Sequence, residues 1–158
     1  MEQHHISVMI SEEEIEKRVC ELAAQISSDF AGETVKLICI LKGSAFFACE
    51  LAKRITVPVM IDFMQVSSYG SGTVSSGTVQ IKKDLDEPLK DENVIIVEER
   101  GSKDLRICTL LSKPERREVE IDVAYNGFEI PDKFVVGYGL DYDQHYRNLP
   151  YVGVIESE

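Results

Sequence analysis

The four residues Leu41-Lys42-Gly43-Ser44 place a cation and a flexible backbone where a strand meets a helix. The segment that precedes them, Val35–Leu41, is short, β-branched and almost entirely apolar, which is typical of a buried parallel strand. Glycine allows a ligand to approach the backbone closely, and free N–H groups at the start of a helix attract anions. This turn is therefore a candidate phosphate site, although glycine at such a junction often serves only the turn itself.

Charged side chains also follow the next two strands that the sequence predicts. Glu98 and Glu99 come directly after Asn93–Val97, and Lys113 comes after Arg106–Leu111. Ligands of open α/β sheets bind at the carboxyl ends of the strands, where these side chains are expected. Two adjacent carboxylates there could bind ribose hydroxyls or Mg²⁺, and Lys113 could donate to a ligand carbonyl. The alternatives are a solvated strand end and an ordinary surface lysine.

A third group of candidates lies near the C-terminal end of the chain. Phe134 could stack on a flat ring, and the backbone near Val135 could contact the edge of that ring. Asp141 could contact a metal, and Arg147 could pair with a phosphate or with a neighbouring carboxylate. Taken alone, a phenylalanine in such a segment is more often part of the core.

The segment Val66–Gly77 is rich in serine and glycine and carries Ser68 and Tyr69. It has few core candidates, so the sequence predicts a long mobile loop. One function for such a loop is to close over a reacting centre and exclude water. A plain solvent-exposed loop is the alternative.

The chain has 158 residues, which fits a single domain spanning residues 1–158, and its formal net charge is −11. That charge argues against binding to nucleic acid or an anionic membrane, because both would repel it. No apolar run approaches the length of a membrane span, and the first ten residues do not resemble a signal peptide. The four cysteines have no C-x-x-C spacing and are predicted to be buried free thiols in a cytosolic protein: Cys20, Cys39, Cys49 and Cys108.

The predicted elements alternate between strands and helices, which favours an α/β fold with a mainly parallel sheet. One helix begins after Ser11, where Glu14 completes a capping box, and another covers Ala45–Ile55. Strands are predicted at His4–Ile10, Val35–Leu41, Val57–Met64, Val79–Ile81, Asn93–Val97, Arg106–Leu111, Ile121–Tyr125, Phe134–Tyr138 and Tyr151–Ile155.

The middle of the chain contains an inconsistency. Only the residues Glu98 to Leu105 separate two buried strands, whereas parallel neighbours usually need a connection of at least about 10–12 residues. Glu99-Arg100-Gly101 resembles the last turn of a helix whose beginning is missing. Either the chain lacks an internal segment near residues 98–101, or that segment belongs to the molecule but not to the printed sequence.

Taken in order, the motifs of this chain resemble those of bacterial hypoxanthine–guanine phosphoribosyltransferases. The stretch GFEIPDKFVVGYGLDY is highly specific, and the similarity covers almost the whole chain. The matching segments are LKGS at 41–44, SSYGSG at 67–72, VQIKKDLD at 79–86, VIIVEE at 94–99, ICTLLSKP at 107–114 and GFEIPDKFVVGYGLDYDQHYRNLPYVGVI at 127–155.

The resemblance implies a type I phosphoribosyltransferase fold, with a small hood built from the N- and C-terminal segments. It implies transfer of 5-phosphoribosyl from phosphoribosyl pyrophosphate to N9 of hypoxanthine or guanine, which gives IMP or GMP and pyrophosphate. Mg²⁺ is the implied cofactor. A homodimer or homotetramer is the implied assembly, because members of the family form dimers or tetramers.

The resemblance also assigns roles to the candidate residues. Leu41, Lys42 and Gly43 would bind pyrophosphate through a cis peptide bond between the first two, together with Arg147. Lys113, Phe134, Val135 and Asp141 would bind the purine, and Asp141 would also face a second Mg²⁺. Glu98 and Glu99 would bind the ribose hydroxyls directly or through Mg²⁺, and Ser68 and Tyr69 would belong to the closing loop.

The chain departs from the family pattern after VIIVEE. The family continues there with a loop of the form D-x-x-D-S/T-G-x-T, which holds the sugar 5′-phosphate and supplies the general base, and then with a helix. Here Arg100-Gly101 follows instead. An intact transferase and a variant that keeps only purine and pyrophosphate binding both remain open, whereas the acidic charge disfavours an RNA-binding regulator on a related fold.

Overall fold

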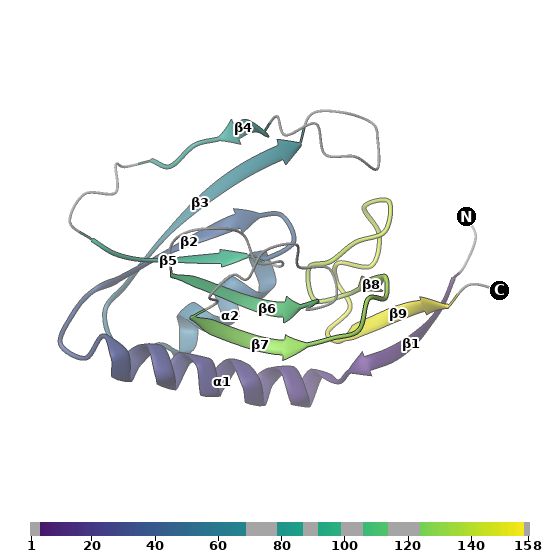
Figure 1. Ribbon diagram of the computed structural model, residues 1–158, viewed down its shortest axis with the longest axis horizontal. Coiled ribbons are helices and arrows are strands. Elements are labelled where there is room, and N and C mark those ends of the chain that lie inside the picture. The colour runs from purple at the N-terminus through teal and green to yellow at the C-terminus, as the bar shows by residue number, and fades with distance from the viewer. Residues whose placement is uncertain (1–3, 69–78, 87–91, 99–105, 114–123, 157–158) are drawn as a thin grey trace.

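A computed structural model describes residues 4–68, 79–86, 92–98, 106–113 and 124–156 of the chain (Figure 1). Its elements run in the order β1 (His5–Ile10), α1 (Glu12–Asp29), β2 (Val35–Leu41), α2 (Ala45–Arg54), β3 (Val59–Ser68), β4 (Val79–Lys83), β5 (Asn93–Glu98), β6 (Ile107–Ser112), β7 (Tyr125–Glu129), β8 (Val135–Val136) and β9 (Val152–Glu156).

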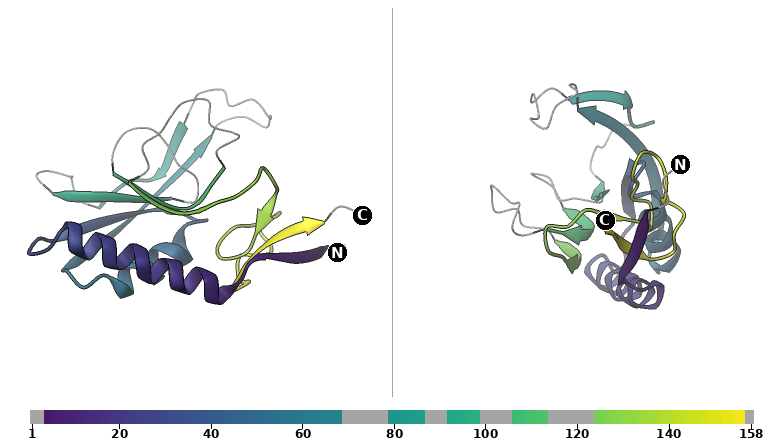
Figure 2. Two further views of the ribbon diagram at one scale, coloured as in Figure 1. Left: turned by 60° about the horizontal axis from the view of Figure 1, so that its bottom comes forward. Right: turned by 90° about the vertical axis from the view of Figure 1, so that its right-hand side faces the viewer.

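The main sheet has six strands in the order β4-β3-β2-β5-β6-β7. All neighbouring pairs are parallel except β3 with β4, which are antiparallel. Helices α1 and α2 pack against the same face of this sheet (Figures 1 and 2). The predicted α/β fold with a mainly parallel sheet is therefore confirmed.

Helix α1 forms as the sequence predicts. Ser11 caps it, and its hydroxyl accepts a hydrogen bond from the Glu14 N–H while the Glu14 carboxylate accepts one from the Ser11 N–H. This reciprocal pair satisfies two N–H groups that the helix leaves unpaired. The residues at helical spacing are all buried toward the sheet: Ile15, Val19, Leu22, Ala23 and Ile26.

The two ends of the chain form a second, three-stranded sheet in the order β1-β9-β8. Strand β1 pairs antiparallel with β9, so that His5 lies opposite Glu156. Figure 1 shows β1 and β9 side by side at one end of the molecule. This small sheet is the hood that the sequence predicts from the N- and C-terminal segments.

Several predicted strand boundaries were wrong, three of them by a wide margin. The predicted strand Ile121–Tyr125 is instead β7, which begins at Tyr125, and its residues 121–123 lie outside the described part of the chain. The predicted strand Phe134–Tyr138 shrinks to β8, because the backbone enters the left-handed region at Gly137. Strand β3 runs on to Ser68, into the predicted loop, because its last residues pair with β4.

The prediction that eight residues cannot join two parallel neighbours was also wrong. Strands β5 and β6 are parallel neighbours, with Ile96 opposite Ile107 and only residues 99–106 between them. Because Ile107 lies opposite Ile96, the chain that leaves Glu98 must run back along the sheet by the length of only two residues, roughly 7 Å. Eight extended residues span roughly 25 Å, so the connection is short but sufficient. Residues 99–105, including the predicted helix end, lie outside the described part.

The cysteine prediction was correct for two residues and wrong for two. All four thiols are free, and Cys39 and Cys108 are buried in strands of the main sheet. Cys20 and Cys49 are exposed, because they lie on the outward faces of α1 and α2. Their apolar sequence neighbours belong to the opposite, buried faces of the same helices.

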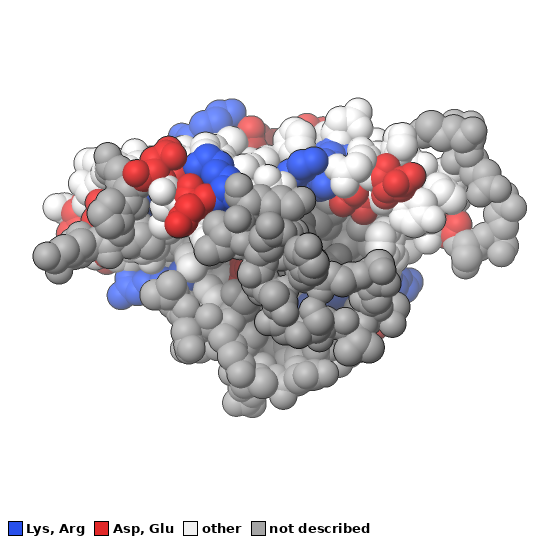
Figure 3. Space-filling model, turned by 90° about the horizontal axis from the view of Figure 1, so that it is seen from above, with Lys and Arg blue, Asp and Glu red and all other residues white. Residues whose placement is uncertain are grey.

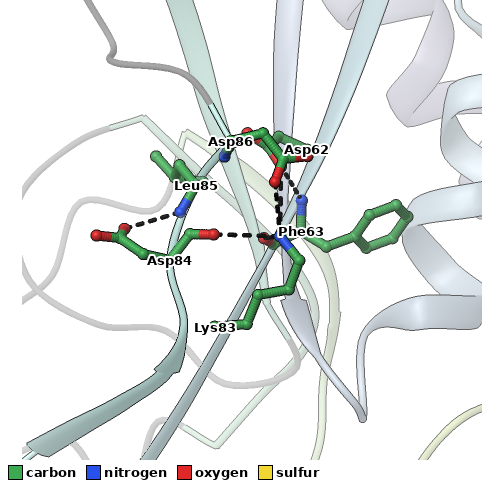
Figure 4. Close-up of polar contacts among 6 residues, drawn as sticks. All are labelled: Asp62, Phe63, Lys83, Asp84, Leu85 and Asp86. Atoms are coloured by element: carbon green, nitrogen blue, oxygen red, sulfur yellow. Dashed lines mark hydrogen bonds and ion pairs between the residues drawn. The ribbon is translucent and has the colours of Figure 1, made fainter.

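Polar contacts hold the antiparallel strand β4 against β3 (Figure 4). The Lys83 ammonium donates to the Phe63 carbonyl at 3.0 Å and to the Asp84 carbonyl at 3.1 Å. The Asp62 carboxylate accepts from the N–H groups of Phe63 at 2.7 Å and Asp86 at 3.0 Å. These contacts fix residues 84–86 beside the sheet and so set the direction in which the chain leaves β4.

Candidate active site

The parallel strands bring the predicted site residues to one edge of the main sheet. Leu41 ends β2, Glu98 ends β5, and Lys113 follows the end of β6. Strand β2 lies beside β5 and β5 beside β6, so these three carboxyl ends are neighbours (Figure 1). The edge is where ligands bind in open α/β sheets.

The turn Leu41–Ser44 joins β2 to α2, and we call it the strand-end turn. Its first peptide bond, between Leu41 and Lys42, is cis, as the sequence resemblance implies. The buried Ser44 hydroxyl lies 2.6 Å from the Ile40 carbonyl oxygen and 3.1 Å from that of Val97, and it makes no capping bond to the helix. Ser44 therefore ties the turn to both strands that end beside it.

A second segment, Gly137–Arg147, folds into two successive tight hairpins, and we call it the double hairpin. In the first, Gly137 and Leu140 exchange both backbone hydrogen bonds, at 2.9 and 3.0 Å. In the second, Tyr142 and His145 do the same at 3.1 and 2.9 Å. The two central residues of each turn have positive φ: Tyr138 (50°) and Gly139 (98°), then Asp143 (49°) and Gln144 (63°). Positive φ at both central residues is the pattern of a type I′ turn.

The strand-end turn and the double hairpin are in close contact at two glycines. A Cβ atom added to Gly139 would lie 2.2 Å from the Gly43 carbonyl oxygen, so no side chain fits there. Gly139 also has a φ of 98°, which favours glycine independently. The backbones of the two segments therefore pack directly against each other.

Hydrogen bonds and an ion pair place Arg147 between the two hairpins. Its Nη1 donates to the Gly139 carbonyl at 2.6 Å, and its Nη2 lies 3.2 Å from Asp141 Oδ1. Gln144 lies beside both, since its N–H donates to Asp141 Oδ2 at 2.8 Å. The Gln144 side-chain oxygen accepts from Lys42 Nζ at 3.3 Å. The structure thus brings together Lys42, Asp141 and Arg147, which the sequence nominated separately.

Two of the predicted purine-binding residues, Phe134 and Val135, lie in the segment that leads into the double hairpin, and Lys113 follows β6. Phe134 is 51% exposed, and its ring meets Tyr142 edge to face with centroids 5.8 Å apart. Val135 is buried in β8, and Lys113 Nζ lies 3.9 Å from Asp132 Oδ1. An aromatic ring that is half exposed can offer a surface for stacking.

Some predicted residues lie beyond what the structure describes. Tyr69 and Glu99 lie outside the described residues, and Ser68 is described only as the last residue of β3. Glu98 is half-buried at the end of β5. The structure therefore places the pyrophosphate and purine candidates and one of the two adjacent acids.

Two residues of the site escaped the sequence analysis. Gln144 lies inside the matching segment 127–155, but it is polar and uncharged and no charge pattern marks it for a role. Tyr138 packs beside α1 and α2, where burial raises its pKa to about 12 and the nearby Glu50 carboxylate adds to the rise. Its phenol is therefore neutral at physiological pH. Successive glycines at 137 and 139 were the available signal for a turn at this residue.

The described residues contain no cluster of three or more histidine, cysteine or acidic side chains that could hold a metal ion. The donors nearest the edge are single carboxylates, Glu98 and Asp141. Mg²⁺ is usually held by one or two carboxylates together with substrate phosphates and waters. This donor set therefore fits a metal that arrives with a phosphorylated substrate better than a permanently bound one.

A parallel sheet with a strand-end turn and a cation-bearing hairpin at its carboxyl edge fits the class of phosphoribosyltransferases. Consistent with that class, residues 9–100 match the family described as the phosphoribosyl transferase domain. The chain is 45% identical over 171 residues to the hypoxanthine phosphoribosyltransferase of Salmonella typhimurium, with 96% of each chain covered. It is 42% identical over 178 residues to that of Haemophilus influenzae, covering 100% of this chain and 99% of the relative.

A solved structure agrees with the sequence comparisons. The hypoxanthine phosphoribosyltransferase of Staphylococcus aureus superposes with a TM-score of 0.89 at 44% identity, covering 95% of this chain and 91% of that one. The chain therefore belongs to the hypoxanthine phosphoribosyltransferase family.

Proposed function

We propose that this protein transfers 5-phosphoribosyl from phosphoribosyl pyrophosphate to N9 of hypoxanthine or guanine, releasing pyrophosphate. The observation that carries the proposal is the convergence of Lys42, Asp141 and Arg147 at the carboxyl edge of the sheet, in a chain of this family. The products are IMP or GMP, and the reaction salvages purine bases. The relatives named above are hypoxanthine phosphoribosyltransferases, which supports this choice of substrate.

The leaving pyrophosphate binds between the strand-end turn and the double hairpin. Lys42 and Arg147 supply two cations there, and the backbone of Leu41–Gly43 approaches the ligand without interference from a side chain at Gly43. As the bond at C1′ breaks, negative charge builds up on the pyrophosphate. Cations held in place beforehand stabilise that charge without reorganising at the moment of reaction.

The purine stacks on the exposed face of Phe134. The backbone at Val135 contacts the edge of the base, and Lys113 donates to its O6. Phe134 is 51% exposed, so part of its ring stays open to a ligand while the edge-to-face contact with Tyr142 holds it. Glu98 and Glu99 bind the ribose hydroxyls, and the segment that carries Ser68 and Tyr69 keeps water away from C1′.

Mg²⁺ enters with phosphoribosyl pyrophosphate in this proposal. Glu98, Glu99 and Asp141 are the carboxylates that would hold it, together with oxygens of the substrate. When bound, the ion neutralises charge on the diphosphate and orients its oxygens.

The chain acts in the cytoplasm and assembles as a homodimer or homotetramer, and its partners are small molecules. No helix in the described part of the chain has the length and apolar character needed to cross a membrane. Lysines and arginines on the face shown in Figure 3 are interspersed with acidic residues and form no continuous basic stripe among the described residues. This distribution supports the proposal that nucleic acid is not a partner.

A second candidate is a variant that binds purine and pyrophosphate without transferring the sugar. The alignment with the Haemophilus influenzae relative runs over 178 positions, whereas this chain has 158 residues, which leaves about 20 positions without a counterpart. The short connection between β5 and β6 is the natural place for such a gap, near residues 98–101. In this proposal the chain lacks the loop that would hold the 5′-phosphate.

A steady-state assay separates the two candidates. The protein is first checked by intact-mass spectrometry, which shows whether its mass is that of the 158-residue chain. Formation of IMP from hypoxanthine and phosphoribosyl pyrophosphate is then followed, with Phe134→Ala as a comparison. The transferase proposal expects IMP formation and a raised KM for hypoxanthine in the variant. If the wild type forms no IMP and calorimetry still shows hypoxanthine and pyrophosphate binding, the second candidate is the correct one.

A further inference from the structure

Gln144 has a backbone conformation that is unfavourable for its residue type. It is the second central residue of the turn between Tyr142 and His145, with a φ of 63°, and Asp143 before it has a φ of 49°. Type I′ turns favour glycine, which has no Cβ, and asparagine, whose short amide can hydrogen-bond to the local backbone, because a Cβ is strained when φ is positive. A glutamine in this conformation points to a role for its side chain.

The exposed Gln144 side chain connects the two segments that bear the proposed pyrophosphate cations. Its Oε1 accepts from Lys42 Nζ at 3.3 Å and from Arg147 Nη2 at 3.4 Å. Lys42 belongs to the strand-end turn and Arg147 to the double hairpin. One uncharged oxygen atom therefore lies between two ammonium or guanidinium groups that come from distant parts of the sequence.

We infer that Gln144 is a positioning residue that sets the spacing of Lys42 and Arg147 for a diphosphate ligand. The inference rests on the proposed function, since it concerns the same pyrophosphate site. An amide oxygen orients both cations through hydrogen bonds but leaves their charges available to the ligand. Asp141 already lies 3.2 Å from Arg147. A carboxylate in place of the Gln144 amide would therefore neutralise more of the positive charge of Lys42 and Arg147.

Isothermal calorimetry with magnesium pyrophosphate tests the inference directly. Gln144→Leu removes the acceptor and should weaken binding roughly three- to tenfold, as expected for lost hydrogen bonds to charged groups. Gln144→Glu places a negative charge beside the anion and should weaken binding more than Gln144→Leu does. Gln25→Leu, an exposed glutamine on α1, is the matched control and should bind like the wild type. Equal affinity of Gln144→Leu and wild type would overturn the inference.

Gln144→Gly separates positioning from a structural role. Glycine relieves the strain at positive φ, so the melting temperature should rise by roughly 1–3 °C. Pyrophosphate affinity should nevertheless fall, because the acceptor is gone. A Gln144→Gly variant that is more stable than the wild type but binds pyrophosphate equally tightly would contradict the inference. A variant that loses both stability and affinity would also contradict it, because a general loss of structure would then explain the weaker binding.

The steady-state parameters give an independent readout that distinguishes this inference from the proposed function. Gln144→Leu should raise KM for phosphoribosyl pyrophosphate while KM for hypoxanthine stays unchanged. If the wild type itself takes up no magnesium pyrophosphate, the proposed function of this site is wrong and the inference falls with it. If the wild type binds and the variant matches it, only the inference is wrong.

Discussion

At the scale of single residues, the contact between Gly139 and Gly43 sets how closely the strand-end turn and the double hairpin approach. Gly139→Ala would place a methyl group 2.2 Å from the Gly43 carbonyl oxygen, in a conformation that alanine also disfavours. We expect this variant to lose at least about 2 kcal/mol of unfolding free energy and most of its pyrophosphate affinity. Urea unfolding and calorimetry measure the two effects.

Gly32→Ala is the matched control for that substitution. Gly32 has a φ of 80°, but an added Cβ there has no atom within 4 Å. Its cost is only that of the left-handed backbone, about 1 kcal/mol, and pyrophosphate binding should be unchanged. Similar losses in the two variants would show that the conformation, and not the contact with Gly43, explains the effect at Gly139.

The sequence could nominate the charged residues of the site but not the contacts among them. Lys42, Asp141 and Arg147 were nominated because charges at strand ends and beside glycines are recognisable in a linear pattern. Gln144 was missed, because a neutral residue without a turn signature becomes meaningful only when a distant lysine lies next to it. The roles that the family resemblance assigns to these residues are still predictions.

At the scale of elements, Asp62 links β3 to the chain that follows β4. Burial alone would raise the pKa of its carboxyl group, but the N–H groups of Phe63 and Asp86 and the Lys83 ammonium together lower it. Stability contributed by the ionised carboxylate is therefore present above its unfolded pKa of about 3.9 and is lost as the pH falls through the folded pKa. Figure 4 shows that these donors converge on one carboxylate.

Asp62→Asn should lower the melting temperature at pH 7 by roughly 2–6 °C, because an amide replaces one acceptor with a donor. The difference from the wild type should stay nearly constant from pH 7 down to about pH 4 and shrink as the pH falls further, below the unfolded pKa and through the folded one. Thermal melts between pH 7 and about pH 2 measure this. Asp86→Asn is the control, since the Asp86 side chain is 80% exposed and the substitution keeps the backbone N–H. A difference that does not change with pH would argue against the ionised form of Asp62 as the cause.

Arg18 connects helix α1 to β7, the last strand of the main sheet. Its Nε donates to the Gly127 carbonyl at 3.0 Å, and its Nη2 donates to that of Asn126 at 2.6 Å. Arg18→Met should cost about 1–2 kcal/mol, because two backbone acceptors of an edge strand lose a charged donor. Denaturant midpoints measure the loss. Lys17→Met, at the preceding exposed position, should change stability by less than about 0.5 kcal/mol.

The helices were easier to predict than the later strands for a physical reason. Helix α1 shows its capping box and its apolar spacing within one continuous stretch, so local information suffices. A side chain at Gly127 of β7 would clash with the neighbouring strand β6, because its Cβ would lie 2.4 Å from the Leu110 carbonyl oxygen. That constraint comes from a neighbouring strand and is invisible in the sequence around β7.

At the scale of the whole molecule, the second candidate, a chain without the 5′-phosphate loop, has its own expected activity. Turnover should fall well below that of complete family members, because several hydrogen bonds to the sugar phosphate are lost. Inserting the loop D-x-x-D-S/T-G-x-T and its helix after Glu98 should raise kcat/KM for phosphoribosyl pyrophosphate by at least about 100-fold. Steady-state kinetics of the two chains measure this. An unmodified chain that already turns over as fast as the extended one would refute the expectation.

The antiparallel pairing of β1 with β9 has a consequence for the chain as a whole. Because His5 faces Glu156 across that pair, the backbone comes close to forming a closed ring. A short linker could join the two ends, and the polypeptide could then be opened at another surface position without disturbing any contact of the main sheet. The order in which the elements follow one another along the chain is thus separable from the architecture that they build.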